Sequence, residues 1–67
     1  MPNNITVILP SAANDIIEKR KPLGLFLTIE NNMWIAIDNL TGDAWTEEFY
    51  NSDIAIKWLS DRTMEVK

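Results

Sequence analysis

Two neighbouring segments with a hydrophobic period of two constrain the fold of this chain more than any other feature. In residues 23–30 and again in residues 33–38, aliphatic side chains occupy every second position. This period is typical of β-strands, whose successive side chains point to opposite faces of a sheet. The intervening pair, Asn31 and Asn32, favours a turn because asparagine tolerates left-handed backbone angles. The sequence therefore predicts an antiparallel hairpin.

The length of the hairpin loop decides which side chains share a face. A two-residue loop pairs Ile29 with Trp34 and divides the aliphatic residues between the two faces of the sheet. A three-residue loop from Glu30 to Asn32 sets three aliphatic pairs opposite one another: Ile29–Met33, Leu27–Ile35 and Leu25–Ile37. We expect the three-residue loop because it collects the aliphatic residues on one face.

A third strand follows the strongest turn signal in the chain, residues 38–43 (DNLTGD). The strand is expected over residues 44–50. With Ile37 facing Trp45, the core side carries Trp45, Glu47 and Phe49, and the outer side carries Ala44, Thr46, Glu48 and Tyr50. An inward Glu47 is acceptable if this is an edge strand, where charge discourages further pairing.

Helical periodicity appears on both sides of these strands. The first helix is expected over residues 11–21, with Ser11 as N-cap and a stop at Pro22. The second is expected over residues 53–62, with Ser52 as N-cap and a frayed tail at 63–67. Residues 5–9 (ITVIL) predict a short strand or an extended arm, while residues 1–4 are expected to fray.

These elements predict one small α+β domain over residues 1–67, in the order (β)-α-β-β-β-α. Two helices side by side need a width of about 20 Å, which matches four strands about 4.8 Å apart. This match favours a four-stranded sheet in which residues 5–9 form a parallel strand, with both helices on one face. A three-stranded meander remains the alternative.

Composition limits the function classes. The chain has 67 residues, a net charge of −4, and neither Cys nor His. It therefore lacks thiolate ligands and the commonest general base and metal ligand. Its serines have no histidine to activate them, and its two glycines form no phosphate cradle. We expect no enzyme activity, no cofactor, no metal, no direct nucleic-acid binding and no membrane contact. Missing cysteines and the lack of an export signal favour a cytoplasmic protein.

Three aromatic residues are the first candidate site. If the aliphatic residues form the core, Phe26, Trp34 and Tyr50 remain on the outer face of the sheet. Aromatic side chains are enriched in protein interfaces, so this face is expected to dock a protein partner or a second copy. The alternative is that one helix covers the face and makes it a second core.

The second candidate is an acidic patch formed by Asp43, Glu47 and Glu48. The span from Glu30 to Asp53 contains six acids and no Lys or Arg. Such a span can imitate nucleic-acid charge and bind a basic protein surface, or it can simply keep a small domain in solution. The loop after Asp38 does not fit a calcium-binding loop, because the spacing of its oxygen-bearing residues is wrong. The basic run at residues 19–21 (KRK) suits the C-terminus of a helix.

Four stretches also carry a resemblance: residues 24–26 (GLF), residues 34–39 (WIAIDN), residues 41–49 (TGDAWTEEF), and Ala55 with Trp58 and Leu59. From Leu23 onward the chain resembles a group of short, uncharacterised proteins of Firmicute bacteria and their phages. The resemblance implies that the chain is encoded in a bacterial or phage genome, and it assigns no activity to any residue. We therefore expect a non-enzymatic protein-interaction module that uses the aromatic face. The alternative is a phage-type acidic inhibitor that mimics nucleic-acid charge.

Overall fold

The computed structural model describes the backbone of residues 5–65 and the side chains of residues 5–62. Its elements follow the order β-α-β-β-β-α, which confirms the predicted α+β fold. They are β1 (Ile5–Val7), α1 (Pro10–Lys19), β2 (Gly24–Glu30), β3 (Met33–Asn39), β4 (Trp45–Phe49) and α2 (Ser52–Glu65). The predicted frays at residues 1–4 and 66–67 lie outside the described residues.

The four strands form one mixed sheet in the order β1-β2-β3-β4. β1 runs parallel to β2, and the other neighbours are antiparallel. The fourth strand favoured by the sequence is therefore present, although it ends at Val7 rather than Leu9. α1 connects the two parallel strands. The strand order makes β1 and β4 the two edges of the sheet.

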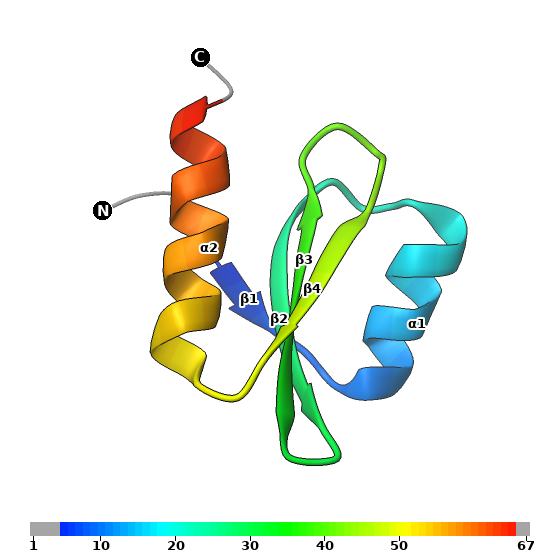
Figure 1. Cartoon of the computed structure of the whole chain (residues 1–67). Coiled ribbons are helices and arrows are strands. Elements are labelled where there is room, and N and C mark those ends of the chain that lie inside the picture. The colour runs from blue at the N-terminus through cyan, green and yellow to red at the C-terminus, as the bar shows by residue number, and fades with distance from the viewer. Residues whose placement is uncertain (1–4, 66–67) are drawn as a thin grey trace.

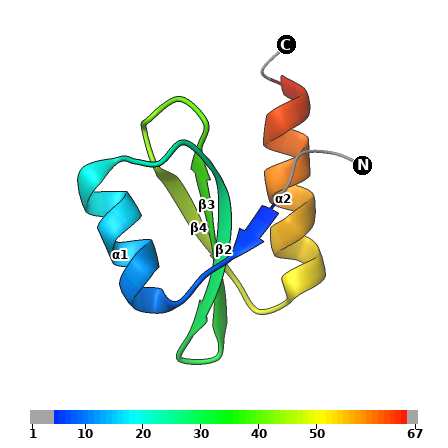
Figure 2. The ribbon, with the colours of Figure 1, turned by 180° about the vertical axis from the view of Figure 1, so that it is seen from behind.

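The helices lie on opposite faces of the sheet, with α1 on one side and α2 on the other (Figure 1 and, from behind, Figure 2). The expectation that both helices share one face is wrong. Each helix has its own hydrophobic cluster: Ala13 and Ile16 of α1 pack with Phe26 and Ile37, whereas Ala55 and Leu59 of α2 pack with Leu25, Leu27 and Ala36. The sheet is thus the middle layer of three.

The β2–β3 hairpin explains this two-sided core. Its loop contains only Asn31 and Asn32, whose φ angles of 55° and 64° are the positive values that a type I′ turn needs. Ile29 therefore pairs with Trp34, and Leu27 with Ala36. The predicted three-residue loop is wrong, because a core with two sides does not require all aliphatic residues on one face.

The register of β4 differs from the expectation by one residue. Trp45 pairs with Asp38, and Thr46 pairs with Ile37. The predicted alternation within the strand still holds: Trp45, Glu47 and Phe49 share the α2 side, and Thr46 and Glu48 share the α1 side. Neither side is simply outer, because each faces one helix.

Both helix starts differ from the predicted ones. α1 begins at Pro10, which suits the first helical position because its missing N–H needs no partner there. α2 is capped by Asn51, whose Oδ1 accepts hydrogen bonds from the backbone N–H groups of Asp53 and Ile54 at 2.7 and 3.3 Å. α2 also continues to Glu65, so the predicted fray is wrong for residues 63–65.

The turn makes a prediction at Asn32. Asn32→Gly should leave the free energy of unfolding unchanged or raise it by up to about 1 kcal/mol, because glycine adopts positive φ without steric cost. Asn32→Val should lower it by about 1–2 kcal/mol, because a β-branched residue is strained there. Urea denaturation of both variants checks this, and equal effects of the two substitutions would contradict the two-residue turn.

Candidate functional site

The three aromatic candidates do not form one surface. Phe26 faces α1 and is only 7% exposed within the α1 cluster. Trp34 faces the opposite side and packs, half-buried, against the α2 cluster. Tyr50 lies just after β4 and is 89% exposed. The predicted aromatic face is therefore wrong as a unit, and the alternative that a helix covers it holds for Phe26.

This placement predicts different costs for three alanine variants. Phe26→Ala should lower the free energy of unfolding by about 3–5 kcal/mol, because it empties a buried site. Trp34→Ala should cost less, since its ring is half-buried, and Tyr50→Ala should change stability by no more than about 0.5 kcal/mol. Urea midpoints measured on the three variants test the order. A Tyr50→Ala variant as unstable as Phe26→Ala would refute the placement.

A charged pair connects α2 to the C-terminal end of β3. Arg62 Nε donates to Asp38 Oδ2 at 2.7 Å, and the Asp38 side chain is only 8% exposed. The Arg62 guanidinium also lies 4.7 Å from the ring centroid of Trp58 and 5.6 Å from that of Trp45. Such stacking favours arginine over lysine, because the planar guanidinium can bond a carboxylate and cover aromatic rings at once.

The loop after β3 is organised by side chains that bond the backbone. Asn39, fully buried, donates from Nδ2 to the Pro22 carbonyl at 2.8 Å and accepts from the Ala44 N–H at 3.1 Å. The latter bond holds Ala44 at a φ of 52°, which is unfavourable for a residue with a Cβ. Thr41 Oγ1 donates to Asp43 Oδ2 at 2.8 Å. These contacts are those of a stabilised turn, and the described residues contain no cluster of three potential metal-binding side chains.

The Arg62–Asp38 pair can be tested by a double-mutant cycle. Arg62→Met should lower the free energy of unfolding by about 2 kcal/mol, because it leaves a nearly buried carboxylate without its cation. In an Asp38→Asn background the same substitution should cost clearly less. Chemical denaturation of the four proteins gives the coupling. Additive effects would show that Arg62 acts only through packing on Trp58 and Trp45.

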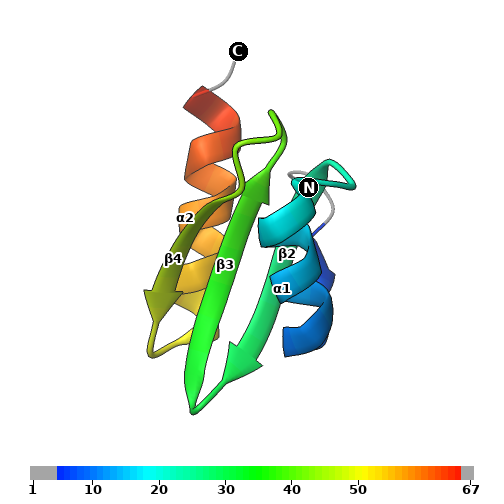
Figure 3. The same cartoon turned by 90° about the vertical axis from the view of Figure 1, so that its right-hand side faces the viewer.

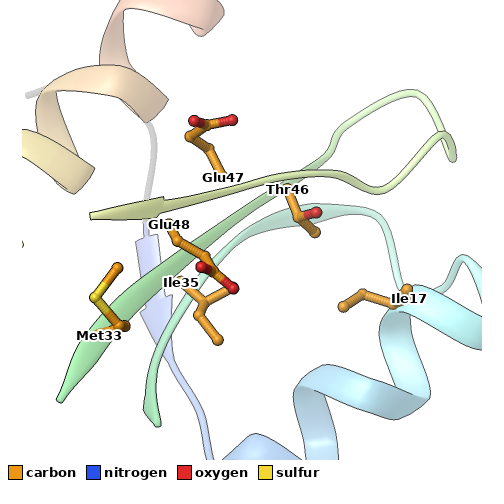
Figure 4. Close-up of a pocket in the computed structure, with 6 residues that line it drawn as sticks. All are labelled: Ile17, Met33, Ile35, Thr46, Glu47 and Glu48. Carbon is orange, nitrogen blue, oxygen red and sulfur yellow. The ribbon is translucent and has the colours of Figure 1, made fainter. Parts of the chain in front are cut away.

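The acidic candidates are also separated. Asp43 lies exposed in the loop, where Thr41 binds its carboxylate. Glu47 pairs with Ala36 on the α2 side, whereas Glu48 pairs with Ile35 on the α1 side. Figure 4 shows the carboxylates of Glu47 and Glu48 on opposite sides of β4. The three acids therefore do not make a continuous row of charge, although Glu47 and Glu48 flank one exposed strand from both sides.

Beside β4 lies a surface that the sequence analysis missed. α1 covers β2 and Ile37 of β3 on its side of the sheet, and it leaves β4, together with Met33 and Ile35 of β3, partly open (Figure 3). The resulting open hollow, here called the β4 groove, has a volume of about 510 Å³. It is lined by Ile17, Met33, Ile35, Thr46, Glu47 and Glu48 (Figure 4). It joins apolar side chains from α1 and β3 to the acidic edge strand.

The groove was missed because its walls depend on helix placement. Ile35 belongs to the aliphatic period-two pattern, and nothing in the sequence says that α1 stops short of β4. The period-two pattern did place Thr46 and Glu48 on one side of the strand. Had the helices been assigned to opposite faces, that side would have been recognised as half covered.

Comparison with protein-family models, with curated proteins and with solved structures gave no match. Within the described residues, no helix is long and apolar enough to cross a membrane.

Proposed function

We propose that the protein is a non-enzymatic interaction module that binds a basic segment of another protein at the β4 groove. The observation that carries the proposal is an exposed edge strand with a mixed groove beside it, apolar on the α1 and β3 side and polar along β4, and a glutamate on each side of the strand. No Lys or Arg lies between Glu30 and Asp53 in the sequence, and the ion pairs of the described side chains, Lys57–Asp61 and Arg62–Asp38, involve neither glutamate. This proposal keeps the expected class of function and moves its surface from the aromatic residues to β4.

The groove has the composition of a binding surface rather than of a core. Ile17 is 38% exposed although it is aliphatic, and Met33 and Ile35 are only partly covered. Covering these side chains would remove apolar surface from water, which stabilises a complex by roughly 25 cal/mol for each Å² buried. The glutamates beside them would attract a cationic partner and repel an anionic one. Apolar contact and charge thus favour the same kind of partner.

The two glutamates are poorly placed for catalysis. Acid–base chemistry by a carboxylate pair needs both groups at one substrate. Glu47 and Glu48 both line the groove, but their carboxylates point to opposite sides of β4, so only the Glu48 carboxylate is directed to the α1 side. We therefore assign binding, and no reaction, to this surface.

The acidic span also supports a second candidate, a phage-type inhibitor that imitates nucleic acid. Its motivation is the run of six acids without a base and the resemblance to proteins of Firmicute bacteria and their phages. Charge mimicry of a duplex requires phosphate-like charges in a row. Because Glu47 and Glu48 lie on opposite sides of the strand, and Asp43 belongs to a separate loop, the support is weaker than for the interaction module.

An array of immobilised random peptides tests the proposed function without knowledge of the natural partner. The wild-type protein should select peptides enriched in Lys and Arg together with aliphatic residues, and added salt should weaken the selection. The double variant Glu47→Lys/Glu48→Lys should lose at least about 10-fold of the bound signal, since each reversal replaces an attraction by a repulsion.

The matched control is Asp15→Lys/Glu18→Lys, which changes net charge equally at two exposed positions of α1. Asp15 borders a different hollow, beside Lys19 and Pro22. This control should select the same peptides as wild type. If the two double variants lost binding equally, recognition would depend on net charge and not on the β4 groove. Selection of peptides for Lys and Arg alone, with no enrichment of aliphatic residues, would instead favour the inhibitor.

A further inference from the structure

β4 presents an unpaired sheet edge. It is the last strand of the sheet, and within the described residues its backbone pairs only with β3. An edge strand exposes N–H and C=O groups that an additional strand can bind. No described segment lies across this edge in Figure 3, where α2 is behind the sheet and α1 is in front of β2. The edge is therefore open to an extended segment.

The side chains of β4 specify which residues such a segment needs. An added strand alternates between the two faces just as β4 does, so directly opposite residues share a face. A base opposite Glu47 lies on the α2 side, and a base opposite Glu48 lies on the α1 side. Two consecutive basic residues therefore each meet one glutamate. This arrangement turns the separation of the two acids into a recognition pattern.

Apolar positions flank the two acids. On the α2 side, Trp45 is 55% exposed and Phe49 is partly exposed. On the α1 side, Thr46 borders the β4 groove together with Ile35. Residues of the added strand opposite Thr46 and Phe49 thus meet neutral or apolar surface, and the residue opposite Trp45 meets an indole ring that Arg62 also contacts. β-Branched or aromatic side chains suit those positions.

We propose that β4 binds an extended segment of another protein by strand addition, and that the segment carries two consecutive basic residues between apolar ones. The inference deepens the proposed function and depends on it. Main-chain hydrogen bonds to the β4 edge contribute affinity, and the basic pair sets the register.

A second copy of the chain does not fit this edge. A two-fold antiparallel pairing of the whole of β4 would place Glu47 directly opposite Glu47 of the other copy, which is destabilising. The only run of consecutive bases, Lys19 to Lys21, lies at the end of α1, where Arg20 caps the helix at a φ of 64°. That run is not extended and cannot pair as a strand.

The probe is a capped peptide of sequence TVKRIVT, added to isotope-labelled protein and followed by NMR. The peptide should shift the amide signals of residues 45–49 and slow hydrogen exchange of the amides that point away from β3. Three control peptides accompany it. Two have the same sequence and carry N-methyl groups on alternate amides, one peptide for each edge of the extended chain, and in the third (TKVRIVT) the two bases are separated by one residue. Methylation of the edge that faces β4 should weaken binding at least about 10-fold, because that edge can no longer donate hydrogen bonds to the strand, whereas methylation of the other edge should leave binding unchanged.

The separated bases of the third control lie on one face, so this peptide should bind severalfold more weakly than TVKRIVT. If both N-methylated peptides bound as tightly as TVKRIVT, strand addition would be refuted, while the proposed basic-segment binding at the β4 groove would stand. The same holds if the separated and consecutive bases bound equally. Absence of any shift at millimolar peptide would overturn the strand-addition inference. The peptide array judges the proposed function independently, because it makes no assumption about the conformation of the bound segment.

Discussion

The two-residue turn at Asn31 and Asn32 is the constraint on which the rest of the structure depends. Both residues adopt positive φ, which aligns Ile29 with Trp34 and sends alternate residues of β2 and β3 to opposite faces. Each face then carries enough apolar surface for one helix: Phe26 and Ile37 under α1, and Leu27 and Ala36 under α2. A shift by one residue would exchange every side chain between the faces.

Polar contacts between distant segments add to the stability that the two hydrophobic clusters provide. Ala36, Ala55 and Leu59 are fully buried, so α2 packs closely on β3. Arg62 then reaches Asp38 at the end of the same strand, and Asn39 joins the following loop to Pro22. Because a domain of this size buries only about 60% of its chain surface, such contacts between distant segments contribute a substantial share of its small stability.

The division of the core also creates the candidate binding surface. One helix on each face cannot cover four strands, so β4, together with Met33 and Ile35 of β3, remains partly open beside α1 (Figure 3). The uncovered area contains Ile35 and ends at a strand with glutamates on both sides. An inward-pointing charge on an edge strand is a known means of preventing uncontrolled pairing. In the proposed strand addition, the same charges disfavour a second copy and favour a basic strand.

Local sequence determined the elements, and tertiary structure decided their faces. The period of two in β2 and β3 and the helical period of α1 and α2 follow from backbone geometry, so the order of elements was predictable, as was the alternation of Glu47 and Glu48 across β4. The register of β2 against β3 was not predictable, because a two-residue and a three-residue loop both satisfy local preferences. Only the number of sheet faces that helices cover distinguishes the two loop lengths. That number depends on which side of the sheet each helix packs, a choice made by contacts between residues far apart in the chain. Phe26 was consequently assigned to a surface and lies in a core, whereas the β4 groove arose only when the strands and α1 were brought together.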